Sequence, residues 1–219
     1  MLVITPFMIV GLIVGFAAGA TSLWPEFRGP TGQGLATASG VPFRWDAEND
    51  NTWQTAIPGK GWSSPILLND RVYLTTAIAD GDIVTGPQSL RALCLNATSG
   101  ELIWNVEVFT RDEDTEDTIH DKNSHASSTP LTDGQRLFVH FGVDGTAALD
   151  LDGNVIWSNQ DIHYEPNHGG GGSPIFSGSL LVFNCDGVKD PFIVAVSRDT
   201  GEVQWRTQRP ETEGLKFSF

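Results

Sequence analysis

Short apolar stretches alternate with turn residues along most of this chain, and they recur in the same order three times. Each unit opens on a Ser/Pro stretch, which reads WSSPILL from Trp62, ASSTPLT from Ala126 and GGSPIFS from Gly171. An apolar stretch follows a tight turn, as RVYLTTA from Arg71, RLFVHFG from Arg136 and SLLVFNC from Ser179. A third follows as LRALCLN from Leu90, GTAALDL from Gly145 and PFIVAVS from Pro191. Short apolar runs bounded by turn residues predict strands.

The last strand of each unit follows a Gly turn and ends on a tryptophan. These segments are SGELIW to Trp104, DGNVIW to Trp157 and TGEVQW to Trp205, with Gly100, Gly153 and Gly201 in the turns. With Trp53, the tryptophans recur about every 50 residues, the length of one propeller blade. The sequence therefore predicts an all-β propeller of four-stranded antiparallel blades, with about three full blades after a leading outer strand.

Proline marks the innermost strand of each blade. Pro65, Pro130 and Pro174 share one position in the repeat. Because proline cannot donate to a strand ladder, this position indicates an edge strand, which in a propeller faces the channel. The tryptophans at the outer strands are expected to wedge between neighbouring blades.

At these residues the chain resembles the pyrroloquinoline-quinone-like (PQQ-like) propeller repeats, whose blades end in a Gly turn followed by Trp. WPEFRGPTGQG, from Trp24, looks like the leader of exported members, and NTWQTAIPG, from Asn51, looks like an outer strand that closes the ring. The family includes quinoprotein alcohol dehydrogenases and the non-enzymatic scaffold BamB. Its rings have seven or eight blades, so the resemblance implies an incomplete ring, whose next inner strand begins at residues 215–219.

The expected organisation starts with a secretory signal over residues 1–20. Its apolar stretch ends in Ala18-Gly19-Ala20, small residues that a signal peptidase accepts, and polar residues follow. An uncleaved membrane anchor is the alternative, since no Lys or Arg precedes the apolar stretch. The partial propeller then comprises a leader and outer strand over 21–61 and blades over 62–107, 123–160 and 168–209. The protein is thus expected to be exported, either periplasmic or extracellular.

The net charge and the cysteine content limit the classes of partner and cofactor that the chain is expected to bind. The formal net charge of −14 disfavours nucleic acids, which are held through Lys and Arg on phosphates. Cys94 and Cys185 fall in different repeats and are expected to be buried free thiols. The resemblance associates dehydrogenase activity with an adjacent Cys pair, and this sequence has none. No cofactor is therefore expected, with PQQ and Ca²⁺ possible only in a complete relative.

Two other stretches receive structural interpretations. The acidic run from Arg111 to Asp121 lacks the alternating ligands and the Gly of a calcium loop, which indicates a solvated loop. The run Gly169 to Gly172 precedes a strand, whereas a phosphate loop precedes a helix.

The longer connections are expected on one face of the propeller, where rigid scaffolds place their binding groups. Candidate ligand-binding residues on or near that face are Asn123, His125, His140, Asp144, His168, Asp186 and Lys189. His125 and His168 stand at comparable points before their inner strands. The hypothesis is a shared polar mouth for an anionic or metal-bridged ligand; the alternative is a set of unrelated solvated side chains.

The function expected from the sequence is a non-catalytic binding or assembly scaffold of the cell envelope. Its partner would be a protein or small ligand at the loop-rich face, with membrane contact only through an uncleaved N-terminal segment. Unpaired strand edges predict self-association of the isolated chain. The alternative function is an enzyme, quinoprotein-like or other, with its site at the channel mouth.

Overall fold

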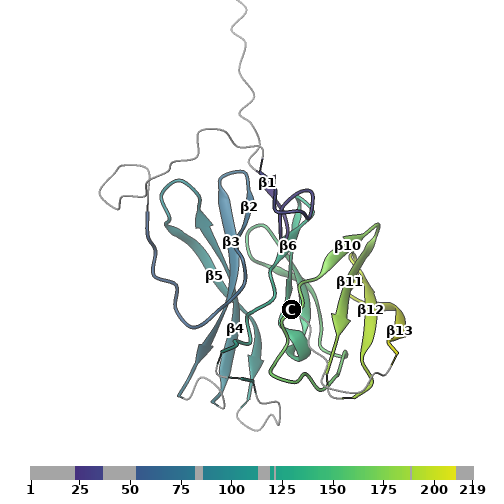
Figure 1. The fold of residues 1–219 in the computed structure, drawn as a ribbon. Helices are drawn as coiled ribbons and strands as arrows, with labels where there is room; N and C mark the ends of the chain where they lie inside the picture. Colours follow the sequence, from purple (N-terminus) through teal and green to yellow (C-terminus); the bar gives the residue numbers. More distant parts are fainter. Residues whose placement is uncertain are drawn as a thin grey trace, which may run out of the picture.

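A computed structural model of the chain describes residues 23–36, 53–81, 86–112, 119–120, 122–187 and 189–210. Within these ranges the protein is built from three antiparallel sheets that stand side by side (Figure 1). Each sheet is one blade, and its strands follow chain order from the inner to the outer edge. The prediction of an all-β propeller with four-stranded blades is confirmed.

The first blade contains β2 (Ile66–Leu68), β3 (Arg71–Ala79), β4 (Gln88–Asn96) and β5 (Leu102–Arg111), and β1 (Leu23–Trp24) pairs with its inner edge. The second contains β6 (Leu131–Thr132), β7 (Arg136–His140), β8 (Thr146–Asp150) and β9 (Val155–Asn159). A single 3-10 turn, η1 (Gly142–Asp144), lies between β7 and β8. The third contains β10 (Ile175–Ser177), β11 (Leu180–Cys185), β12 (Phe192–Ser197) and β13 (Val203–Gln208).

Tryptophan and glycine form the joint between blades. The Trp104 indole donates to the Leu151 carbonyl at 3.1 Å, and the Trp157 indole donates to the Arg198 carbonyl at 2.9 Å. In both joints the ring covers the Gly of the next blade, and a Cβ at Gly201 would lie 2.5 Å from the Trp157 ring. Gly201 has a φ of 74°, so an L side chain there would be strained as well. At both joints the blades are therefore held together by a tryptophan of one blade that packs on a glycine of the next.

Two apolar clusters fill the spaces between blades. The first joins Tyr73 and Leu90 of the first blade to Leu137 and Val139 of the second, and Cys94 lies within it. The second lies between the second and third blades and contains Cys185. Both cysteines are buried free thiols, as expected. In the part of the chain that the structure describes, no helix has the length and apolar character needed to cross a membrane.

Several local expectations are wrong. Residues 53–59 form no strand, although Trp53 docks on the first blade by donating to the Ala97 carbonyl at 2.9 Å. The strand β5 runs on to Arg111, well beyond Trp104, the residue at which the sequence predicts that the last strand of this blade ends. Strand β1 was not expected. The prolines stand immediately before β2, β6 and β10 rather than inside them.

Some predictions fall outside the described residues. These are the signal segment 1–20, most of the acidic run after Asp112, and the inner strand expected at residues 215–219.

Candidate functional site

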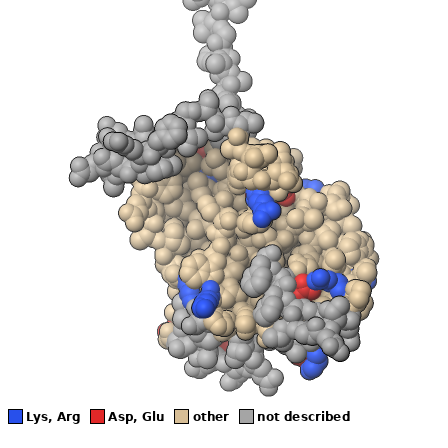
Figure 2. All heavy atoms as spheres, viewed as in Figure 1, with Lys and Arg blue, Asp and Glu red and all other residues tan. Residues whose placement is uncertain are grey.

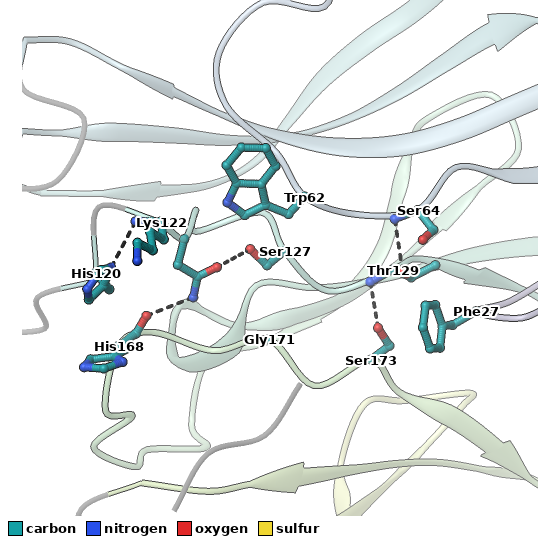
Figure 3. Close-up of a pocket in the computed structure, with 11 residues that line it drawn as sticks. Phe27, Trp62, Ser64, His120, Lys122, Ser127, Thr129, His168, Gly171 and Ser173 are labelled. Carbon is teal, nitrogen blue, oxygen red and sulfur yellow. Dashed lines mark hydrogen bonds between the residues drawn. The ribbon is translucent and has the colours of Figure 1, made fainter. Parts of the chain in front are cut away.

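A cavity of about 610 Å³ is lined by the segments that immediately precede the inner strands β2, β6 and β10 (Figure 3). Six of its lining residues occupy two positions of the repeat. Trp62, Ser127 and Gly171 stand three residues before the shared proline, and Ser64, Thr129 and Ser173 stand one residue before it. Phe27 of the leader adds a further wall. We call this space the inner-face cavity.

The space exists because one position of the repeat differs between blades. Trp62 has a large ring that is 55% exposed, while the corresponding residues Ser127 and Gly171 are small. Phe27 is 48% exposed at the opposite end. Because one wall is aromatic and the facing residues are small, the cavity has room for a ligand. Three bulky side chains at this position would fill that space.

Hydroxyl groups tie the three blades together along the cavity. The Ser64 amide donates to Thr129 Oγ1 at 3.1 Å, and the Thr129 amide donates to Ser173 Oγ at 3.0 Å. The same position of each blade thus contacts the same position of the next. These contacts fix the cavity walls relative to one another.

The other end of the cavity is formed by the connections that lead to β6 and β10. The His120 and His168 rings lie 4.8 Å apart, and the Asn123 amide donates to the His168 carbonyl at 2.9 Å. His168 adopts a φ of 85°, which is uncommon for a residue with a side chain. Lys122 stands beside His120 in Figure 3. The structure therefore brings together two predicted site residues, Asn123 and His168.

Two others, His125 and Asp144, meet in a separate buried cluster between the first and second blades. His125 Nδ1 lies 3.4 Å from Asp144 Oδ2, and the Arg111 guanidinium donates to Asp144 Oδ1 at 2.8 Å. The side chains of all three are at most 10% exposed. His125 therefore does not share the cavity with His168, despite their similar places in the sequence.

The remaining three predicted residues lie apart from the cavity. His140 is 2% exposed, bonds Thr146 Oγ1 through Nδ1 at 2.8 Å, and lies against the Phe183 ring. Burial lowers the pKa of His140 from 6.5 to about 4, although Asp144 opposes the shift. The expectation that His140 approaches the loop-rich mouth is therefore wrong, since it is a neutral core residue.

Asp186 and Lys189 belong to the third blade. The buried Asp186 carboxylate pairs with Arg209, which follows β13, and also accepts from the Asn184 amide at 2.9 Å. The exposed Lys189 pairs with Glu165 at 3.3 Å. Neither residue lines the inner-face cavity.

Sequence reasoning missed the residues that make the cavity, namely Phe27, Trp62 and His120. A signal for Trp62 was present, because counting back from the shared proline places Trp62, Ser127 and Gly171 at equivalent positions. The leader residue Phe27 carried no such signal, since no repeat contains it. His120 lies opposite His168 through a bridge between Ile119 and His168, which only the fold reveals.

The described walls of the cavity do not fit a quinone held with Ca²⁺. Calcium takes several carboxylate or carbonyl oxygens. No described lining residue is acidic, and Asn123 Oδ1 already accepts from the Ser124 amide and the Ser127 hydroxyl. Across the described ranges, no group of three or more His, Cys, Asp or Glu is placed to hold a metal ion. On the face shown in Figure 2, the described charged side chains form a few small groups on a largely uncharged surface.

Comparison with known proteins gives a family and a fold. Residues 75–216 match the family model described as outer membrane protein assembly factor BamB. The fold is similar to quinohemoprotein alcohol dehydrogenase from Comamonas testosteroni, with 14% identity, a TM-score of 0.53, and coverage of 85% of this chain and 27% of that one. The chain thus spans about a quarter of the length of that structure. A search of curated proteins finds no match.

Two further similar structures have lower TM-scores. Quinohemoprotein alcohol dehydrogenase from Pseudomonas putida has 17% identity and a TM-score of 0.47, over 74% of this chain and 24% of that one. BamB from Moraxella catarrhalis has 16% identity and a TM-score of 0.41, over 68% of this chain and 41% of that one.

Proposed function

This chain belongs to the PQQ-like propeller family of the outer membrane protein assembly factor BamB, and we propose that it is an exported cell-envelope scaffold that binds a protein partner at its inner-face cavity without catalysis. The observation that carries the proposal is the cavity itself, with half-exposed Phe27 and Trp62 on its walls. Aromatic side chains in a concave site are the groups that most often dominate binding energy.

Several titratable side chains of the predicted site are engaged inside the blades and do not line the cavity. A catalytic acid or base must reach the proton that it transfers. Here the carboxylate of Asp144 faces Arg111 and His125 in a buried cluster, and that of Asp186 pairs with Arg209. His140 is buried and neutral. These groups support the blades, and the proposal assigns no cofactor to them.

In-cell photo-crosslinking tests this function. A photo-reactive phenylalanine analogue is placed at Phe27 or Trp62, with Leu35 as the matched control because it is 69% exposed and does not line the cavity. We expect both cavity positions, and not residue 35, to crosslink to the same envelope protein.

Two results would overturn the proposal. One is the absence of a crosslinked protein from both cavity positions. The other is purified protein that binds PQQ and reduces a dye with an alcohol substrate, which would favour the enzyme alternative.

A further inference from the structure

The leader contacts the inner edges of the first two blades through its main chain. β1 pairs antiparallel with β2, with Trp24 opposite Leu67, and the Thr132 amide of β6 donates to the Pro25 carbonyl at 2.9 Å. Leu67 and Thr132 each stand two residues after the shared proline, so they occupy one position of the repeat. Two consecutive leader residues thus contact the same position in two consecutive blades.

The third blade lacks such a partner among the described residues. Phe176 holds the same position, in the middle of β10. Ser177 and Leu180 flank the two-residue turn between β10 and β11 and so form a hydrogen-bonded pair. Because hydrogen-bonded and non-bonded pairs alternate, the Phe176 main chain faces away from β11. β10 is the inner edge of its sheet, and no described residue bonds to the Phe176 amide there.

The leader turns back after it has contacted β6. The Gly29 amide donates to the Glu26 carbonyl at 2.9 Å, and Arg28 has a φ of 64°, which closes a tight turn. Phe27 lies in this turn and lines the inner-face cavity at the end where Ser173 also lies (Figure 3). Ser173 stands three residues before Phe176, so this end of the cavity adjoins the segment that leads to the open edge of β10.

An open strand edge next to an aromatic cavity suits an extended peptide segment. The edge offers N–H and C=O groups that an added strand completes, and alternate side chains of that strand enter neighbouring pockets. Phe27 and Trp62, both about half exposed, offer apolar walls for such a side chain. The pairing of β1 with β2 shows that an inner edge of this protein accepts an added strand.

We infer that an extended segment of the partner protein adds to the inner edge of β10, where its main chain pairs with that of Phe176 and one of its apolar side chains enters the inner-face cavity. This inference rests on the proposed scaffold function and specifies how the partner is held.

Proline substitution tests the pairing, with the in-cell crosslink from residue 27 as the readout. Phe176→Pro removes the edge N–H but no bond between β10 and β11, because this amide faces away from β11. Phe176→Ala is the matched control, since it removes the same ring from Phe138 and Arg198 and keeps the amide. We expect the crosslink to be about fivefold or more weaker in Phe176→Pro than in Phe176→Ala, because a main-chain hydrogen bond is lost.

Amide hydrogen exchange gives a second measurement that needs no substitution in β10. In the free protein the Phe176 amide should exchange about tenfold or more faster than the Thr132 amide, which donates to Pro25. In the purified complex crosslinked through residue 62, exchange at Phe176 should slow by about tenfold or more, while exchange at Thr132 stays unchanged. This measurement decides the question if Phe176→Pro does not fold.

The outcomes separate the strand addition from the scaffold function. Equal crosslinking in Phe176→Pro and Phe176→Ala, or unchanged exchange at Phe176 in the complex, would overturn the strand addition while the crosslinked partner still supports a scaffold. A Phe176 amide that exchanges as slowly as Thr132 in the free protein would also overturn it, since another segment would already occupy the edge. The absence of crosslinks from both Phe27 and Trp62 without any change in β10 would remove the scaffold function and this inference with it.

Discussion

The joint between the second and third blades gives the sharpest prediction for stability. Trp157→Ala removes a ring packed on Gly201 and Phe138, together with the indole bond of 2.9 Å to the Arg198 carbonyl. Truncation of a buried Trp to Ala costs about 3–5 kcal/mol, and the lower end applies because this ring is only partly buried. We expect a loss of about 3 kcal/mol in the free energy of unfolding.

Trp205 is the matched control, because it holds the same position in the third blade but is 40% exposed and makes no indole hydrogen bond with a described residue. Trp205→Ala should cost about 1 kcal/mol, the usual loss for a point substitution. The difference of about 2 kcal/mol corresponds to roughly 4–8 °C in Tm for a chain of this size. Thermal unfolding followed by far-UV circular dichroism measures it. Equal losses for the two variants would refute the joint as the source of stability.

Three further predictions concern buried polar groups. Because burial lowers the pKa of His140 from 6.5 to about 4, the unfolded state binds a proton that the folded state excludes between those pH values. Stability should therefore fall by up to about 3 kcal/mol as the pH drops through this window, and by less in His140→Gln, as urea unfolding at several pH values would show. Ser173→Ala should cost about 1 kcal/mol in urea unfolding by leaving a main-chain amide without its acceptor, while Ser64→Ala, whose hydroxyl accepts no bond from a described main-chain amide, should cost little. Arg111→Met should lose about 3 kcal/mol by leaving Asp144 buried without its cation, and adding Asp144→Leu should recover much of that loss; a double variant no more stable than the single one would contradict this account.

The fold could be predicted from the sequence because its signals repeat. The Gly turn and the Trp recur in register, and a pattern present three times cannot be explained as an ordinary core strand. Strand lengths were less predictable. β5 continues to Arg111 through polar residues such as Asn105 and Glu107, because its pairing with β4 supplies order that local propensity does not.

The candidate site was predictable only in part. Asn123 and His168 share the cavity, but His125 faces Asp144 instead. His125 stands five residues before the proline that precedes its inner strand, whereas His168 stands six residues before the corresponding proline. This difference of one residue in position is enough to place the two side chains in different environments. Phe27 reaches the cavity because β1 pairs with β2, a long-range contact that leaves no mark on the leader sequence.

The repeated joint also bears on how such a chain can evolve. In each blade a tryptophan from the preceding segment packs on the Gly turn, and Trp104 and Trp157 pack in this way on the blade that follows their own. Duplicating or exchanging a segment of about 50 residues therefore preserves the joints at both of its ends. The inner position that reads Trp62, Ser127 and Gly171 takes part in no such joint. Selection can therefore reshape the cavity blade by blade while the joints between the described blades are kept, which gives a family of this kind a route to new ligands without a new fold.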